Sequence, residues 1–308
     1  MTQRMKHFVV FLILFHLPIA YAQQVADTTF NPTLKNPAYA FEQGPVVYID
    51  EGHHNFHTKD GRYRAFANLL QRDGYRVKAH RGAFTAKSLT NYKLLVISNA
   101  LHAENRTNWT NPTHSAFSPA EIMHVANWVK QGGSLFLIAD HMPMGGAAAD
   151  LAKAFDFQFT NGFAFDSVRR EPTVFSHDRG NLKANLITRG QTTEESVSEV
   201  VSFTGQAFKS PPEAEEIIGF NARFINLLPD TAWAFRPHTK QHNLKGWSQG
   251  AYRTFGRGKI VVFGEAAMFT TQLAGPDRIP VGMNSPMAPQ NYQLLLNIIH
   301  YLDGILEE

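Results

Sequence analysis

The 308-residue sequence contains no cysteine. This absence excludes disulfide bonds, thiolate metal sites, a cysteine-linked lipid anchor and a cysteine nucleophile. A domain without such cross-links depends on its hydrophobic core for stability. Because 44% of the residues are hydrophobic, the chain is able to bury the core of one large domain.

Long hydrophobic runs are also scarce, and the one at the N-terminus is shorter than the roughly 20 residues that span a bilayer. Arg4 and Lys6 precede this apolar run, which ends in the small-residue pattern Ala20-Tyr21-Ala22. The pattern predicts a signal peptide over residues 1–22, cleaved after Ala22. We therefore expect a secreted or periplasmic protein with no stable membrane anchor after cleavage.

Neither sign of charge is in clear excess. The chain has 29 Lys and Arg against 26 Asp and Glu, and two of the basic residues fall within residues 1–22. The mature chain thus has 27 basic residues against 26 acidic ones. Such a balance does not indicate a nucleic-acid partner, and it leaves the oligomeric state open.

The chain divides into three parts after the signal segment is set aside. Residues 23–44 show neither helical nor alternating periodicity and are interpreted as an extended lead-in. Residues 45–308 are expected to form a single α/β domain. Within it, periodicity is lost over residues 160–249 or so, where Pro, Gly, Thr and Ser are frequent, and we expect an irregular β-rich insertion there.

Short apolar runs alternate with helical patterns along the rest of the domain. Buried strands are expected at 46–50, 94–98 and 134–140, an edge strand at 75–79, and a hairpin at 250–265. Helices are expected at 62–72, from Ser118 to Gly132, at 147–155, and from Tyr292 to Leu306. This alternation predicts an α/β fold with a doubly wound sheet.

Polar residues follow several of these strands directly. The segment 50–57 reads Asp-Glu-Gly-His-His-Asn-Phe-His, and three later strands are followed by Asn99 and His102, by Asp140 and His141, and by Glu265. In open α/β sheets, ligands bind beyond the carboxyl ends of the strands. The four turns are therefore expected to meet in one cleft.

Imidazole and carboxylate side chains in one cleft suit Zn²⁺ or another divalent metal, or else a His base oriented by an Asp. The expected roles are metal ligation by His53, His57 and Asp140, catalysis by His141, Glu265 and Asp50, and ligand binding by His54, Asn99 and His102. Carboxylates at strand ends also cap helices, so the cluster could instead be a polar network that fixes a loop.

Two functions remain open on this evidence. The first is a hydrolase that uses the His/Asp/Glu cleft, with or without a metal. The second is a non-catalytic domain that binds a carbohydrate or a partner, for which Trp109, Trp233 and Trp247 could supply a stacking surface.

Four segments, 46–50, 94–99, 118–140 and 256–265, together suggest a known superfamily, and two longer stretches around the last two are the most specific. Residues 117–141, FSPAEIMHVANWVKQGGSLFLIADH, and residues 255–269, FGRGKIVVFGEAAMF, resemble the class I glutamine amidotransferase-like superfamily, in its branch related to the GIFT domain of intraflagellar transport proteins. The resemblance covers roughly 45–155 and 250–305 and implies a flavodoxin-like, three-layer fold with a mostly parallel sheet. Because the catalytic Cys of amidotransferases is missing, Cys-dependent glutamine hydrolysis is excluded and no catalytic residue is carried over.

Overall fold

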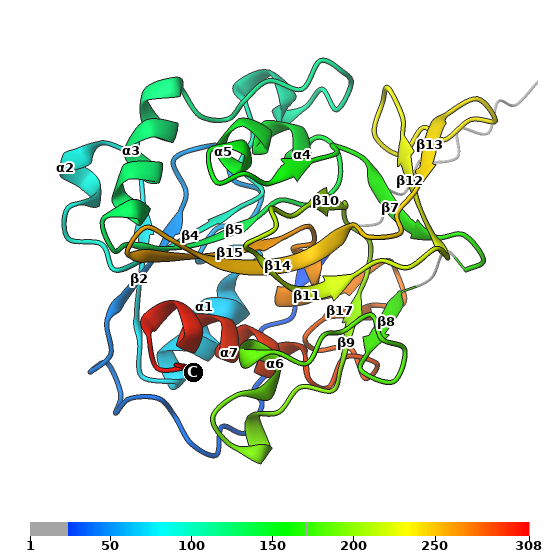
Figure 1. The fold of residues 1–308 in the computed structure, drawn as a ribbon. Coiled ribbons are helices and arrows are strands. Elements are labelled where there is room, and N and C mark those ends of the chain that lie inside the picture. The colour runs from blue at the N-terminus through cyan, green and yellow to red at the C-terminus, as the bar shows by residue number, and fades with distance from the viewer. Residues whose placement is uncertain (1–23, 170–171, 308) are drawn as a thin grey trace, which may run out of the picture.

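A central sheet organises the chain in the computed structural model, which describes residues 24–169 and 172–307. Eight of its nine strands run in the order β3-β2-β4-β5-β15-β14-β10-β6, and the ninth, β11, pairs with β14. Helices cover both faces of this sheet, and smaller sheets lie at one side of it (Figure 1). The site described below depends on where these strands end.

Five neighbouring strands of the sheet are parallel. They are β3 (Arg76–His80), β2 (Val46–Asp50), β4 (Leu94–Ser98), β5 (Ser134–Ile138) and β15 (Gly258–Phe263). β4 and β5 are buried along their whole length, as expected for strands covered on both faces. β3 lies at the edge of the sheet, as its sequence predicts.

The other four strands are antiparallel to their neighbours. They are β14 (Ser248–Phe255), β10 (Phe208–Lys209), β6 (Gln158–Phe159) and β11 (Glu215–Gly219). β14 and β15 form the predicted hairpin, and Gly256 in its turn has a φ of +63°, which favours glycine.

The expected fold class, a flavodoxin-like, three-layer, doubly wound and mostly parallel sheet, is wrong. The protein is β-rich with mixed sheets, and only five of the nine central strands are parallel. The physical reason lies in the stretch without periodicity. Its short strands pair antiparallel with β14 and so extend the central sheet.

Two helical layers pack on the sheet. α1 (Arg64–Arg72) and α7 (Asn291–Asp303) share one hydrophobic core with it, and α3 (Pro119–Lys130) and α5 (Ala149–Lys153) share the other. Shorter helices are α2 (Ala86–Leu89), α4 (Met144–Ala147), α6 (Leu186–Arg189) and the 3₁₀ turns η1 (Ala103–Arg106), η2 (Thr193–Glu195) and η3 (Ala267–Phe269). The helix expected at 147–155 is thus two short helices that begin at Met144.

Three smaller sheets complete the described chain. One contains β13 (Lys240–Asn243), β12 (Phe224–Leu228) and β7 (Phe163–Asp166), and a second contains β8 (Thr173–Ser176) and β9 (Glu199–Ser202). The third joins β1 (Val25–Ala26), β16 (Thr271–Ala274) and β17 (Ile279–Gly282). The lead-in thus contributes a short strand where none was expected.

The predicted signal peptide at 1–22 lies outside the described residues. Within the described part of the chain, every helix is too short or too polar to cross a bilayer. The location of the protein stays a prediction.

Candidate active site

Asp140 and Glu265 occupy equivalent positions at the ends of two adjacent strands. Ile138 ends β5 and Phe263 ends β15, and these two residues are register partners in the parallel pair. Each acidic residue follows two positions later. Parallel pairing therefore brings two carboxyl groups that are 125 positions apart in sequence to one edge of the sheet.

A cavity of about 810 Å³ lies at this edge. Five residues predicted from the sequence line it, namely His57, Asn99, Asp140, His141 and Glu265. Its other walls include aromatic and basic side chains, notably Phe56, Trp109, Trp233, Arg62 and Arg106. We call it the strand-end cavity.

Glu265 is a fully buried carboxyl group in this cavity. Its Oε2 accepts a hydrogen bond of 2.9 Å from the Met268 amide, whereas its Oε1 has no hydrogen-bond partner among the described residues. Burial, and then the nearby charge of Asp140, raise the pKa of Glu265 well above its ordinary value. The protonated form of Glu265, which has a proton to donate, is therefore favoured.

Asp140 is held in place by backbone amides. Its Oδ1 accepts from the His141 amide at 2.7 Å and its Oδ2 accepts from the Ala266 amide at 3.4 Å. The Asp140 amide in turn donates to Oδ1 of Asn99 at 2.8 Å, and Asn99 itself has a left-handed φ of +46°. Asn99 thus positions the strand end and is not merely a lining group.

His57 is a buried imidazole beside these carboxyl groups. Burial, and secondarily the charge of Arg62, lower its pKa to about 3, so the ring is neutral at physiological pH. The ring packs against Tyr63 with centroids 4.7 Å apart. Within the described chain its Nδ1 makes no hydrogen bond, which leaves a neutral, buried nitrogen at the cavity wall.

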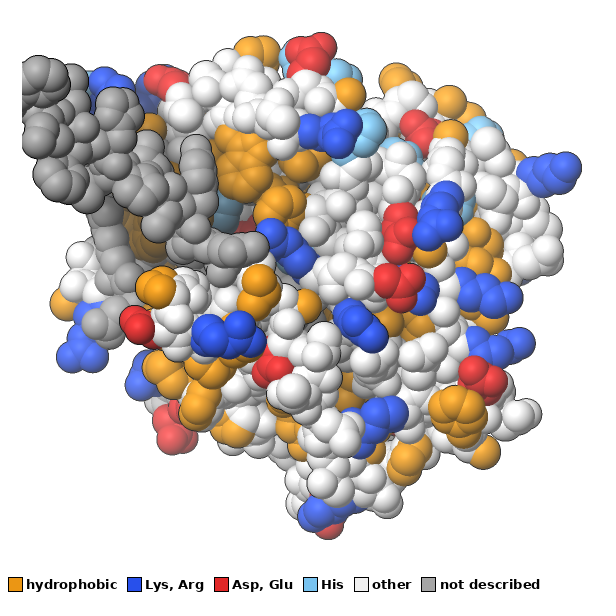
Figure 2. All heavy atoms as spheres, turned by 180° about the vertical axis from the view of Figure 1, so that it is seen from behind, with side chains coloured by type: hydrophobic (Ala, Val, Ile, Leu, Met, Phe, Trp, Pro, Cys, Tyr) orange, Lys and Arg blue, Asp and Glu red, His pale blue; other side chains and the backbone are white. Residues whose placement is uncertain are grey.

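Aromatic side chains form one wall of the cavity. His141 stacks on Phe163 at 4.4 Å and meets Trp233 edge-on at 4.7 Å, and Trp109 lies between His141 at 6.4 Å and Phe56 at 6.0 Å. Viewed from behind, hydrophobic and histidine side chains meet where the surface is hollowed, while charged ones are scattered (Figure 2). Flat apolar faces beside polar groups suit a sugar ring.

Asp50 and His53 form a separate, closed unit. His53 Nδ1 lies 2.9 and 3.0 Å from the two Asp50 oxygens, and Nε2 lies 2.9 Å from Oε1 of Glu121. The ring also packs between Phe84 and Phe117, each at 4.7 Å. Burial opposes the charge of His53, but both carboxylates together raise its pKa. The imidazolium links the loop after β2 to α3.

The remaining expected site residues do not line the strand-end cavity. His54 is exposed and has a left-handed φ of +48°. His102 caps η1, where its Nδ1 accepts from the Glu104 amide at 3.3 Å. These two residues, like Asp50 and His53, shape the loops around the cavity.

The expected metal ligands His53, His57 and Asp140 are not brought together. Both ring nitrogens of His53 face carboxylates of the closed unit. Over residues 24–169 and 172–307, no group of three or more His, Asp or Glu side chains is placed to hold a metal ion. The donor set does not fit Zn²⁺, and the chemistry below involves no metal.

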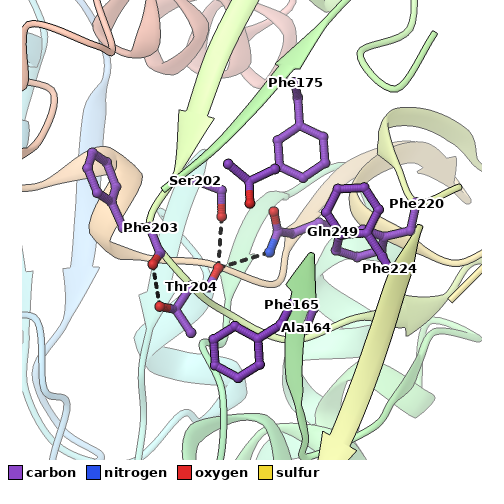
Figure 3. A pocket seen from close by; sticks show the side chains of 10 residues that line it. Ala164, Phe165, Phe175, Ser202, Phe203, Thr204, Phe220, Phe224 and Gln249 are labelled. Atoms are coloured by element: carbon purple, nitrogen blue, oxygen red, sulfur yellow. Dashed lines mark hydrogen bonds between the residues drawn. The ribbon is translucent and has the colours of Figure 1, made fainter. Parts of the chain in front are cut away.

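A second, much smaller cavity adjoins the first (Figure 3). Its volume is about 30 Å³, and Phe203 and Thr204 line both cavities. The Thr204 carbonyl accepts from Ser202 Oγ at 2.8 Å and from Gln249 Nε2 at 3.1 Å (Figure 3). The space holds little more than ordered water, so these bonds serve to fix residues 202–204 as part of the larger cavity's wall.

Sequence reasoning missed Arg62 and Phe56 as cavity residues. Arg62 was assigned to the start of a helix, although α1 begins two residues later. The sequence contains one signal that could have identified Arg62 as a cavity residue. Arg62 lies only five positions after His57 of the histidine-rich loop and directly before the first buried residue of the helix pattern.

The comparisons with known proteins give a family and a fold. The model of the DUF4350 family, described as a domain of unknown function, matches residues 55–275, so the chain belongs to this family. The structure matches the mmIFT52 N-terminal domain with a TM-score of 0.58 at 12% identity, over 83% of this chain and 97% of that one. The cytoplasmic protein STM3548 from Salmonella typhimurium matches with a TM-score of 0.45 at 12% identity, over 83% and 98%. No curated protein matches.

These findings correct the sequence-based assignment. The matching family is DUF4350, so the assignment to the class I glutamine amidotransferase-like superfamily from 117–141 and 255–269 is wrong. The descriptions of the fold as amidotransferase-like and flavodoxin-like are therefore wrong as well. The family description assigns no activity and gives no support to a hydrolase or a signal peptide. The first segment forms α3 and β5 and the second forms β15 and η3, which are local elements of a kind that many unrelated families share, so they do not identify a superfamily.

Proposed function

We propose that the strand-end cavity is the active site of an enzyme that acts on a carbohydrate by general acid–base catalysis, with hydrolysis as the simplest reaction. One observation carries this proposal. The carboxyl group of Glu265 is fully buried at the strand end next to that of Asp140, its pKa is raised by burial and by Asp140, and its Oε1 is left without a partner in the described chain. A carboxyl group with a raised pKa next to a second carboxyl group is the pair of residues that general acid–base catalysis uses.

The chemistry follows from this pair of carboxyl groups. Glu265 donates its proton to the leaving oxygen while Asp140 accepts a proton from the attacking water, whose hydroxyl bonds to the substrate. A proton then returns from Asp140 to Glu265, which restores the starting state. His57, as a neutral ring, can accept or donate a hydrogen bond without adding charge next to this pair.

The aromatic wall supports a carbohydrate as the substrate. Trp109 and Trp233 each meet His141 edge-on, and both line the same cavity as Asp140 and Glu265. The volume of about 810 Å³ is in the range of small-molecule sites.

The experiment measures turnover of nitrophenyl glycosides and reducing-end release from oligosaccharides by the full chain. We expect Glu265→Gln and Asp140→Asn each to lower kcat/KM by about 10²–10⁴-fold, the range for loss of an acid or base. Asp60→Asn, at an exposed aspartate outside the cavity, is the control and should leave it unchanged. A substrate that is turned over equally by wild type and Glu265→Gln would contradict the proposed roles.

A second candidate is a non-catalytic carbohydrate-binding domain, which the same aromatic wall favours. It predicts oligosaccharide binding that is weakened by Trp109→Ala, with no turnover by the wild-type chain. In that case Glu265→Gln should change affinity alone, so calorimetry and the turnover measurement together separate the two functions.

A further inference from the structure

Arg62 differs from two other arginines, Arg223 and Arg253, in what balances its charge. Arg223 makes an ion pair with Asp166 at 2.7 Å, and Arg253 contacts Asp156 at 3.3 Å. Among the described residues, no carboxylate makes an ion pair with Arg62, whose Nη1 only donates to Oε1 of Gln272 at 3.4 Å. The guanidinium lies 4.0 Å above the centre of the Phe56 ring.

Partial burial makes this arrangement costly for the free protein. The pKa of Arg62 is lowered by burial, and no acidic group offsets the effect. A guanidinium carries five N–H donors, and only one of them is satisfied by the long contact with Gln272. Since Arg62 lines the strand-end cavity, its remaining donors are available to a ligand there.

The charges around the cavity also favour a negatively charged ligand. Arg62 and Arg106 both line it, Asp140 supplies a negative charge, and Glu265 is neutral because burial and Asp140 keep it protonated. His57 is neutral as well. The balance over these groups is positive, so an anionic ligand is favoured.

We propose that the ligand of the strand-end cavity is an acidic carbohydrate of the uronate type, whose carboxylate pairs with the Arg62 guanidinium. This inference rests on the proposed function and names its substrate class. A carboxylate is planar and accepts two parallel hydrogen bonds from a guanidinium edge. Phe56 covers one face of Arg62 and so leaves the edge as the site of contact.

The test compares two tetrasaccharides that differ only at C6: cellotetraose and the corresponding β-1,4-glucuronate tetramer. Calorimetry on the full chain at low salt should show at least about tenfold tighter binding of the glucuronate, the effect expected of one charge-assisted pair. Arg62→Gln should abolish the preference and Arg62→Lys should retain part of it. Arg64→Gln, at an exposed arginine two residues away, should retain all of it.

Several results would overturn the inference. They are an equal preference in wild type and Arg62→Gln, the absence of glucuronate binding at millimolar concentration, or tighter binding of 6-sulfated than of 6-carboxylated tetramer. Thermal melting shows whether each variant is folded. Failure of the proposed function is recognised separately: if wild type prefers glucuronate through Arg62 but turns over neither tetramer, the acid–base roles fail and the ligand class stands. If the neutral tetramer is turned over and Arg62→Gln leaves kcat/KM unchanged, the acid–base roles stand and the proposed ligand class fails.

Discussion

Glu265 and Asp140 stand two residues beyond a register pair of adjacent parallel strands, and the charge of Asp140 helps to keep Glu265 protonated. The arrangement is built by the sheet, because β5 and β15 end at the same level. It costs stability at high pH, since Glu265 has to lose its proton in a buried position next to another carboxylate.

Glu265→Gln should therefore change how stability depends on pH. The pKa of Glu265 is raised in the folded state, so its contribution is fully present below the unfolded value of about 4.5 and is lost as the pH rises through the folded pKa. We expect wild type to lose stability in urea as the pH rises above about 5. The variant should lose measurably less, and identical pH profiles for the two proteins would contradict the prediction.

His57 gives the opposite dependence. Its pKa is lowered to about 3, so its contribution to stability is fully present above about 6.5 and is lost as the pH falls towards 3. His57→Gln should flatten the acid limb of the urea-unfolding profile, by up to about 1.4 kcal/mol for each pH unit in this window. The exposed His54 is the matched control, and His54→Gln should leave the acid limb as it is.

A chelator should leave the protein unchanged. The expected ligands His53, His57 and Asp140 are not grouped around a metal position, and His53 is engaged by two carboxylates. Treatment with EDTA, or addition of Zn²⁺, is expected to shift the melting temperature by less than about 1 °C, because a ligand that does not bind the folded state adds no stability. Elemental analysis that finds one bound metal per chain would refute this.

The sequence predicts the strands and most of the helices of the parallel part of the sheet. The capping box of α3 is present as expected, with Ser118 accepting from the Glu121 amide and Pro119 at the first helical position. The strands around 46–50, 94–98 and 134–138 were predicted because they combine buried apolar residues with turn residues at their ends. Such local signals do not depend on distant residues.

Tertiary pairing decided what the sequence did not show. Two-residue strands such as β6 and β10 carry no periodicity, yet they extend the central sheet because β10 pairs with the edge of β14 and β6 then pairs with β10. For the site, topology correctly brought together His57, Asn99, Asp140, His141 and Glu265. The expected topology did not predict that the His53 side chain contacts Glu121, 68 positions away, and not the cavity.

The contact between His53 and Glu121 joins the loop after β2 to α3, and its contribution to stability can be measured. His53 is buried between Asp50 and Glu121, and its charge stabilises both carboxylates. His53→Leu should destabilise the fold by about 3–5 kcal/mol, because it leaves buried acidic groups unpaired.

Glu121 also caps α3, since its Oε2 accepts from the Ser118 amide at 3.0 Å. Ser118→Ala, which removes the side-chain cap and leaves the ion pair between His53 and Glu121 in place, should cost about 1 kcal/mol. Glu121→Gln should cost more than that, because it also removes one partner of the imidazolium. In a double-mutant cycle by urea unfolding, His53→Leu and Glu121→Gln should be non-additive, whereas His53→Leu and an exposed change such as Arg64→Gln should be additive. Additivity of the first pair would mean that the ionic contact between the loop after β2 and α3 contributes nothing to holding the loop beside the cavity.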